Sequence, residues 1–275
     1  MRSSNRIVIC RDPSVKQRSL SRKIALSAAC ACFCSWSLLA LSVHNHVDGG
    51  TVRYPLVLLK GRIAGGSASI QAVNAILSGA ERELEGLVQG QRFKVLARLQ
   101  PGENPLTLRA GAETLTLHLT YIPQTNPNRV RVIYVTDSSG DMEFQRPEDV
   151  SGDVKGRLQT AMRLMQTFTA ESFHDAGLPR RTFNLEEDEN GEVVVHVMTG
   201  DLAASDYQAM DGYALYSQLF REHDAKLPSR ETRDLVIPAF TRFDPVTRKA
   251  LAHTALGGGN FALFGSGNLF TWPAS

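Results

Sequence analysis

The body of this sequence has no cysteine. All four cysteines lie in the first 43 residues, and residues 44–275 contain none. Disulfide bonds therefore cannot stabilise the folded part of the chain. The Cys-x-Cys-x-Cys spacing of Cys30, Cys32 and Cys34 lies within an apolar run, which favours small buried or lipid-modified thiols over a metal site.

The body also lacks an excess of positive charge. The first 43 residues carry seven Lys or Arg and one acidic residue, which leaves 23 basic and 27 acidic residues in the remainder. A mildly acidic body has no basic stripe to neutralise phosphates, so nucleic-acid binding is disfavoured. The 275 residues, 43% hydrophobic and 21% charged, suffice for one large or two ordinary globular domains.

The motifs that mark common catalytic sites are missing. No two of the seven histidines stand four apart with a glutamate beside the first, as a helical zinc site requires. There is no Gly-x-Ser-x-Gly elbow, and the glycine-rich run at 257–260 lacks the lysine of a phosphate loop. From the residues alone we assign no catalytic residue and no metal ligand.

The histidines offer weaker possibilities. His44 and His46 stand two apart, so on an extended strand they would share one side and could make half of a metal site without an evident third ligand. His174 and His223 fall near the C-terminal ends of predicted helices, where a protonated imidazole complements the helix dipole. His253 precedes the glycine-rich run and is the most interesting of the set.

Residues 1–43 are predicted to form a leader. Ile24–Val43 is a stretch of twenty residues without a charge that follows three basic residues, and it is long enough to span a bilayer as a helix. A signal peptide cleaved near Ala40-Leu41-Ser42 and an uncleaved signal anchor both remain open. Either predicts a secreted or membrane-anchored protein, whereas a start without targeting function predicts a cytoplasmic one.

Residues 44–123 have the pattern of short strands. Apolar side chains alternate along 93–99 and 115–121, and turn residues such as Pro101–Asn104 separate the apolar runs. This period of two, without a confident long helix, predicts a small antiparallel β-sandwich domain.

The pattern changes after a polar joint at residues 124–128. The predicted strands are 129–136, 193–198 and 235–240, and the predicted helices are 154–176 and 207–223. The apolar face of the first helix is predicted to consist of Leu158, Met162, Met165, Phe168 and Phe173. Strands that alternate with helices predict an α/β layer over residues 129–275, and with the sandwich before it an α+β protein.

Three separated blocks of the body carry a family resemblance. They are LQTAMRLMQTFTAE at 158–171, GLPRRTF at 177–183, and ALGGGNFALFGSG at 255–267 with Thr271-Trp272-Pro273 behind it. In this order they resemble a zinc metallopeptidase family found widely in fungi, some members of which carry a jacalin-like lectin domain. The likeness covers most of residues 45–275, including the Pro101–Asn104 turn.

The resemblance implies a zincin-like peptidase domain that acts on peptides or proteins. It implies a zinc ion held by a His-Glu-x-x-His helix soon after the Trp-Pro block, with two histidines on the metal and the glutamate as general base. That motif is not among the 275 residues, so the resemblance transfers no ligand to them. The resemblance and the missing motif together predict a family member that is shortened before its zinc site and inactive alone.

The substrate cleft is expected at the glycine-rich segment, because three glycines let another backbone approach closely and an edge strand there could pair with a peptide. The candidate cleft residues are His253, Gly257, Gly258, Gly259, Asn260 and Phe261. Two alternatives stay open. One is a non-enzymatic protein- or carbohydrate-binding protein built on the sandwich and the C-terminal aromatic residues, and the other is a metal-independent hydrolase that uses His253 or Ser266.

Overall fold

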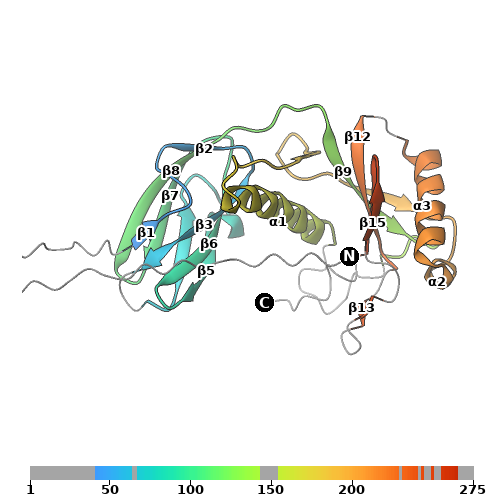
Figure 1. The fold of residues 1–275 in the computed structure, drawn as a ribbon, viewed down its shortest axis with the longest axis horizontal. Helices are drawn as coiled ribbons and strands as arrows, with labels where there is room; N and C mark the ends of the chain where they lie inside the picture. The colour runs from blue at the N-terminus through green and yellow to red at the C-terminus, as the bar shows by residue number, and fades with distance from the viewer. Residues whose placement is uncertain are drawn as a thin grey trace, which may run out of the picture. The chain divides into compact units, whose positions relative to one another are not determined.

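The structure is a computed structural model, and its described residues form an α+β fold. They are 41–63, 67–142, 154–228, 231–240, 243–244, 249–250 and 255–265. Contacts divide the chain into Met1–Ser37 and Leu38–Ser275, and every described residue belongs to the second unit (Figure 1). Within this described part, no helix is both long and apolar enough to cross a membrane. Most of the predicted span, residues 24–40, lies outside it.

Eight strands form the first sheet, in the order β1-β3-β6-β5-β4-β7-β8-β2. Their bounds are β1 Leu41–Val43, β2 Gly50–Val52, β3 Leu56–Ile63, β4 Ile70–Asn74, β5 Glu83–Gln89, β6 Arg92–Arg98, β7 Gly102–Ala110 and β8 Glu113–Tyr121, with a 3-10 turn at Ala80–Arg82. All neighbours are antiparallel except β2 and β8. Alternate residues of these strands bury one apolar core, as the period of two predicted.

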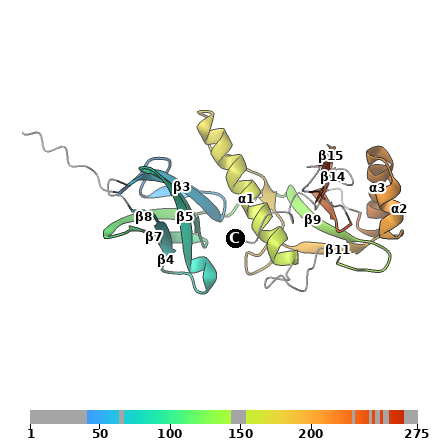
Figure 2. The same cartoon turned by 90° about the horizontal axis from the view of Figure 1, so that it is seen from below.

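Strand β5 joins the two halves of this sheet. Its first residues pair with β4, and Leu87–Gln89 pair with β6, so the strands make one curled sheet (Figure 2). Gly86 lies where the partner changes, and a Cβ there would come within 2.5 Å of the Lys94 carbonyl oxygen. Glycine therefore permits the close approach at this bend. The predicted antiparallel strands are present, but a sandwich of two separate sheets is not confirmed.

Strand β1 lies where the leader was predicted to end. Leu41–Val43 pair with Gly61–Ile63 of β3, and Leu41 is buried in the sheet's core. Gly61 makes this pairing possible, because a Cβ there would come within 1.9 Å of the Ser42 carbonyl oxygen. Residues 41–43 thus lie in the folded sheet.

A second sheet has the strand order β10-β9-β12-β16-β15, with β11 also paired to β9. Its strands are β9 Arg129–Thr136, β10 Asn184–Leu185, β11 Val195–Thr199, β12 Thr232–Pro238, β15 Ala255–Gly258 and β16 Phe261–Phe264, and β13 Phe243–Asp244 pairs apart with β14 Lys249–Ala250. Only β15 runs antiparallel to its neighbour in this second sheet, as far as the described residues extend. The three strands predicted here are confirmed within a few residues.

Helices cover both faces of this second sheet. The bounds are α1 Val154–Asp175, α2 Ala204–Ala209 and α3 Gly212–Lys226. Val132 and Tyr134 of β9 lie in one core with α1, whereas Ile133 and Val135 lie in another with α2 and α3. The predicted single helix at 207–223 is wrong in one respect. The Asp211 carboxylate accepts a hydrogen bond from the Ala214 amide and starts α3 as a separate helix.

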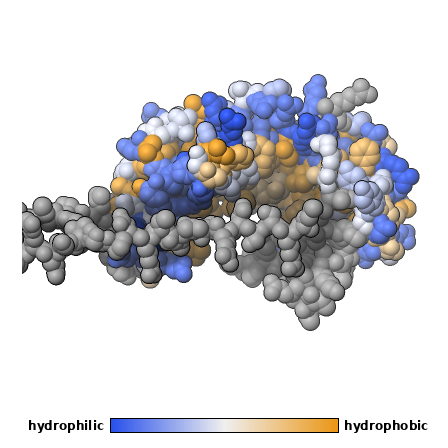
Figure 3. Space-filling model, viewed as in Figure 1, coloured by the Kyte–Doolittle hydropathy of each residue, from blue (hydrophilic) through white to orange (hydrophobic). Residues whose placement is uncertain are grey.

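The predicted apolar face of α1 is only partly correct. Leu158 and Met162 are buried, but Met165, Phe168 and Phe173 are 38%, 75% and 39% exposed. Hydrophobic residues accordingly show at the surface where Figure 1 places α1 (Figure 3). From Arg163 onward the helix instead buries polar side chains, because this part lies against the eight-stranded sheet and its loops. These buried polar residues are Arg163, Gln166, Thr167 and Glu171.

Candidate functional site

The predicted cleft segment is a β-hairpin at one edge of the second sheet. Gly257 and Gly258 end β15, Gly259 and Asn260 make the turn, and Phe261 begins β16. Gly259 has a φ of 61°, which a two-residue hairpin turn requires and which glycine adopts without strain. Among the described residues β15 pairs only with β16. One side of the β15 backbone is therefore at the sheet edge.

The glycines leave this edge uncovered. Residues 257–260 are exposed, and a Cβ built at Gly258 would meet nothing within 4 Å. A Cβ at Gly257 would lie 3.2 Å from the Cβ of Ala262, so of the two glycines in β15 Gly258 is the one that faces open space. A second strand can thus lie beside Gly258 without a side chain there to crowd its own side chains.

Asn260 fixes the turn of the hairpin to strand β12. Its carbonyl oxygen accepts a 2.7 Å hydrogen bond from the Asp234 amide, and its Oδ1 accepts one from the Arg233 guanidinium. Both partners lie in β12, which pairs in parallel with β16. The turn is therefore held at its backbone and at its side chain.

Phe261 anchors the hairpin in the core. It is 3% exposed, and its ring packs edge-on against Tyr216 and Phe220 of α3 at centroid distances of 5.2 and 5.4 Å. The ring also lies 5.3 Å from the His223 ring. Of the candidate cleft residues, Phe261 thus holds the hairpin against α3, whereas the glycines form the exposed edge of the hairpin. His253 and Ser266 lie outside the described residues.

A buried ionic group lies behind this hairpin. Asp234 accepts from Arg131 at 2.7 and 3.0 Å, and His223 Nε2 lies 2.7 Å from its Oδ2. Burial alone would raise the pKa of the Asp234 carboxyl, but hydrogen bonds from His223, Arg131 and Thr232 outweigh it and lower the pKa to about 2. His223, expected near a helix end, does lie in the last turn of α3, yet it is buried and paired with Asp234.

A second polar cluster surrounds Glu171 at the end of α1. Its carboxylate accepts from Arg180 Nε at 2.7 Å, from Asn45 Nδ2 at 2.9 Å and from the Tyr54 hydroxyl at 3.2 Å. Lys60 Nζ lies 3.6 Å away. Burial alone would raise the pKa of Glu171, but hydrogen bonds from His46, Arg180 and Asn45 hold it well below its usual range.

Glu171, His174 and Asp175 are the described residues that bring three potential metal ligands together, with ligand atoms within 4.8 Å of one another. They do not fit a zinc ion. Glu171 is already paired with Arg180, and Lys60 Nζ lies 2.9 Å from Asp175. Two cations therefore already pair with the carboxylates that a divalent ion would need, and a zinc ion there would be repelled by both.

The possible half-site at His44 and His46 is not formed. His44 is exposed, whereas His46 is 8% exposed and lies 3.4 Å from Glu171 through its Nε2. The chain leaves β1 after Val43, so the two side chains do not share one side of a strand. Burial and the neighbouring Arg180 guanidinium lower the pKa of His46 in spite of the nearby Glu171 carboxylate.

Comparison with known proteins identifies the family of the chain. A family model with the description "Putative peptidase family" matches residues 40–275. The chain belongs to this peptidase family. It is 24% identical over 206 residues to a Schizosaccharomyces pombe protein named a putative zinc metalloproteinase, covering 66% of the chain and 34% of that protein. A Saccharomyces cerevisiae protein of the same description is 23% identical over 230 residues, with 68% and 32% covered.

The chain spans about a third of the length of these curated relatives. Among solved structures, wild-type OgpA from Akkermansia muciniphila has a TM-score of 0.37 and 18% identity over 51% of this chain and 39% of that one. Titin domain I10 has a TM-score of 0.23 and 10% identity over 30% of this chain and 98% of that domain. Likenesses of this size carry no conclusion about the fold or the substrate of this chain.

Sequence reasoning missed the Glu171 cluster, although a signal for it was present. Glu171 ends the first family block and Arg180 lies within the second, so the two partners stood in adjacent blocks. The other partners, Asn45 and Tyr54, lie more than a hundred residues away, and no local pattern links them to α1.

Proposed function

We propose that these residues supply the scaffold and one wall of the substrate cleft of a zincin-like, zinc-dependent peptidase. The family assignment supports peptide hydrolysis as the reaction, and the names of the two curated relatives support a zinc ion as the cofactor. The observation that carries the proposal is the exposed, glycine-edged strand β15 at the border of the second sheet.

The edge of β15 suits an extended peptide. A strand at a sheet edge can add a peptide through main-chain hydrogen bonds, and affinity then depends little on the peptide's side chains. Gly258 has no side chain to crowd the side chains of an added strand, and Phe261 and Asn260 keep the hairpin from shifting. The substrate class we propose is therefore a polypeptide segment in extended conformation.

The zinc ligands of this peptidase would come from residues outside the 275 of this chain. The sequence has no His-Glu-x-x-His, and the Glu171 group is occupied by cations. On this proposal the 275 residues alone do not hydrolyse peptides. A secreted or membrane-anchored location belongs to the same proposal, since a charge-free run follows a basic flank at the start of the sequence.

The test compares two purified products. One is the 275-residue chain, and the other continues through any in-frame or spliced sequence that encodes His-Glu-x-x-His. We expect the short product to hold no stoichiometric zinc by elemental analysis and to leave a fluorogenic peptide uncleaved, whereas the long product should hold zinc and cleave the peptide. Stoichiometric zinc in the short product, or no such coding sequence beyond Ser275, would contradict the proposal.

The same assay separates the alternatives. Cleavage by the short product in the presence of a chelator would favour a metal-independent hydrolase. Peptide or carbohydrate binding without cleavage by either product would favour a non-enzymatic binding protein.

A further inference from the structure

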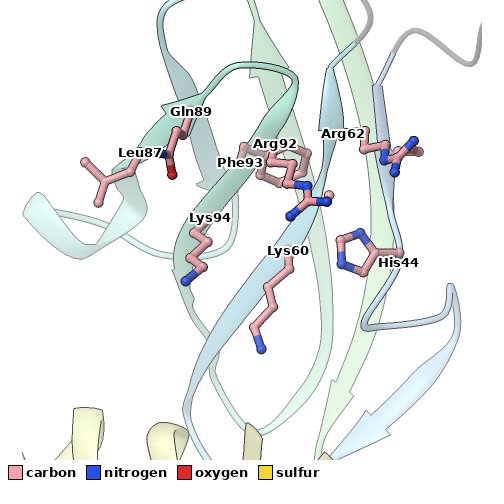
Figure 4. A pocket seen from close by; sticks show the side chains of 10 residues that line it. His44, Lys60, Arg62, Leu87, Gln89, Arg92, Phe93 and Lys94 are labelled. Atoms are coloured by element: carbon pink, nitrogen blue, oxygen red, sulfur yellow. The ribbon is translucent and has the colours of Figure 1, made fainter. Parts of the chain in front are cut away.

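A pocket lined by basic residues lies on the outer side of the eight-stranded sheet, where β1, β3, β6 and β5 run side by side (Figure 4). Its volume is about 680 Å³. The cationic side chains that line it are Lys60, Arg62, Arg92 and Lys94, with His44 beside them, and this set is called the basic pocket below. None of the described residues that line it is acidic.

The four cations form two rows across neighbouring strands. Lys60 of β3 lies directly opposite Lys94 of β6, and Arg62 lies opposite Arg92. Because side chains alternate along a strand, all four project from the same side of the sheet. Figure 4 shows the Lys60 and Lys94 side chains extending in the same direction from their strands. Their backbone positions are about 5 Å apart across the strands and about 7 Å apart along them.

This arrangement costs stability. Like charges directly opposite one another in a sheet are destabilising. Lys60 is partly compensated by Asp175 and Glu171 of α1. In the described part of the chain Arg62, Arg92 and Lys94 have no salt bridge or side-chain hydrogen bond. A body with more acidic than basic residues therefore concentrates uncompensated positive charge at one place, and an anionic ligand would neutralise it.

The neighbours of the cations indicate which anion fits. Leu87 of β5 is 79% exposed and lies opposite Lys94, and Gln89 lies opposite Arg92. The rim thus offers an apolar contact and an amide beside the charges. Carboxylates two residues apart on an extended peptide are about 7 Å apart, which matches the spacing of the cations along each strand. The intervening side chains of such a peptide could contact Leu87.

Other anionic ligands fit less well. A planar bilayer surface does not enter a hollow of this kind, and single-stranded nucleic acid usually needs aromatic side chains on which bases can stack. The aromatic residue of the pocket, Phe93, is 2% exposed and points into the core.

We propose that the basic pocket binds an acidic, extended segment of a polypeptide, with carboxylates held by the Lys60–Lys94 and Arg62–Arg92 pairs. The site is separate from the β15 edge, and the proposal does not depend on peptidase activity.

The test uses the full 275-residue chain and two fluorescein-labelled peptides, one in which Glu alternates with Ser and one in which Gln replaces Glu. We expect fluorescence anisotropy to show that the Glu peptide binds at least about tenfold more tightly, and that added salt weakens its binding. The double variant R62Q/R92Q should lose about tenfold or more in affinity for the Glu peptide. Its Tm should not fall, because the substitution removes a like-charge pair.

The matched control is R53Q/R109Q, which removes two exposed arginines outside the pocket, one in β7 and one directly after β2. It should bind the Glu peptide as the unchanged chain does. If R62Q/R92Q folds poorly, K94Q gives the same readout with a single change. The proposal is overturned if the Gln peptide binds equally well, or if the pocket variants bind like the control. It is also overturned if a heparin oligosaccharide or anionic phospholipid vesicles displace the Glu peptide while binding more tightly than it does.

Discussion

Arg180 Nε lies 2.7 Å from Glu171 Oε1, and this ion pair ties the segment after α1 to the end of that helix. The same Arg180 donates through Nη2 to the carbonyl oxygen of Asn45, which follows β1. Glu171 in turn accepts from Asn45 and Tyr54. One buried carboxylate therefore joins α1, the following loop and the eight-stranded sheet.

Removing this carboxylate should strongly destabilise the chain. Glu171 is 3% exposed, so E171A leaves Arg180 without its anion in a buried place, which typically costs about 3–5 kcal/mol. The matched control is D175A, since the Asp175 side chain is 61% exposed and also pairs with Lys60. The control should cost less than about 1 kcal/mol. Urea unfolding of both variants measures this, and equal losses would contradict the role of Glu171.

Acidification should weaken the same junction through His46. Its pKa is lowered by burial and by Arg180, so the folded chain prefers the neutral imidazole. This preference stabilises the fold fully above pH 6.5, since 6.5 is the ordinary pKa of a histidine. The stabilisation is lost as the pH falls below that value. The charged or titratable groups around His46 are Glu171, Arg180 and His174. Because the pKa of Glu171 is also lowered, this carboxylate stabilises the fold fully above pH 4.5, and its contribution is lost only below that pH.

The measurement is the free energy of unfolding between neutral pH and about pH 5, where His46 contributes and Glu171 does not. We expect H46Q to lose less stability over this interval than the unchanged chain. The control H44Q replaces an exposed histidine two residues away and should follow the unchanged chain. A pH dependence that H46Q leaves unaltered would assign the effect to other groups.

The two sides of α1 should respond differently to truncation. Met162 is fully buried against β9, so M162A should cost roughly 2–5 kcal/mol through lost burial and a cavity. Phe168 is 75% exposed, so F168A should change stability by no more than about 0.5 kcal/mol. Thermal and urea unfolding of the two variants gives the comparison. A large loss in F168A would show that its side chain is covered in solution.

Period and turn residues were enough to predict several of the longer strands and helices. Strand β9 was predicted over the residues it occupies, and α1 ends one residue before the predicted end. The break between α2 and α3 had a local signal as well, because Asp211 is a favoured N-cap residue. Apolar spacing alone suggested continuity, and the cap was overlooked.

The buried polar face of α1 could not be predicted from the sequence. Arg163 is buried because it pairs with Glu81 and Glu192, which lie 82 and 29 residues away. Phe168 is exposed because the helix uses its neighbouring face for these contacts. Such pairings depend on tertiary structure, which overrides the tendency of an apolar side chain to be buried.

The basic pocket had a clearer signal in the sequence, the Lys-x-Arg at 60–62 and the Arg-x-Lys at 92–94. Only the strand register, however, sets these two motifs opposite each other.

The last prediction concerns the edge of β15, where a substitution can add a side chain at Gly258 without disturbing the fold. Gly258 has no positive φ, and a Cβ there meets nothing within 4 Å, so G258V should leave the free energy of unfolding within about 0.5 kcal/mol. The added isopropyl group would project from a face of the sheet beside a peptide paired with this edge and would crowd the peptide's side chains there. In the longer, zinc-containing product we therefore expect kcat/KM for a peptide substrate to fall at least about tenfold, a loss of about 1.4 kcal/mol in transition-state stabilisation. G258A, with a smaller group at the same position, should lose less, and this graded response distinguishes obstruction from unfolding. Unchanged kcat/KM in a stable G258V product would place the substrate elsewhere.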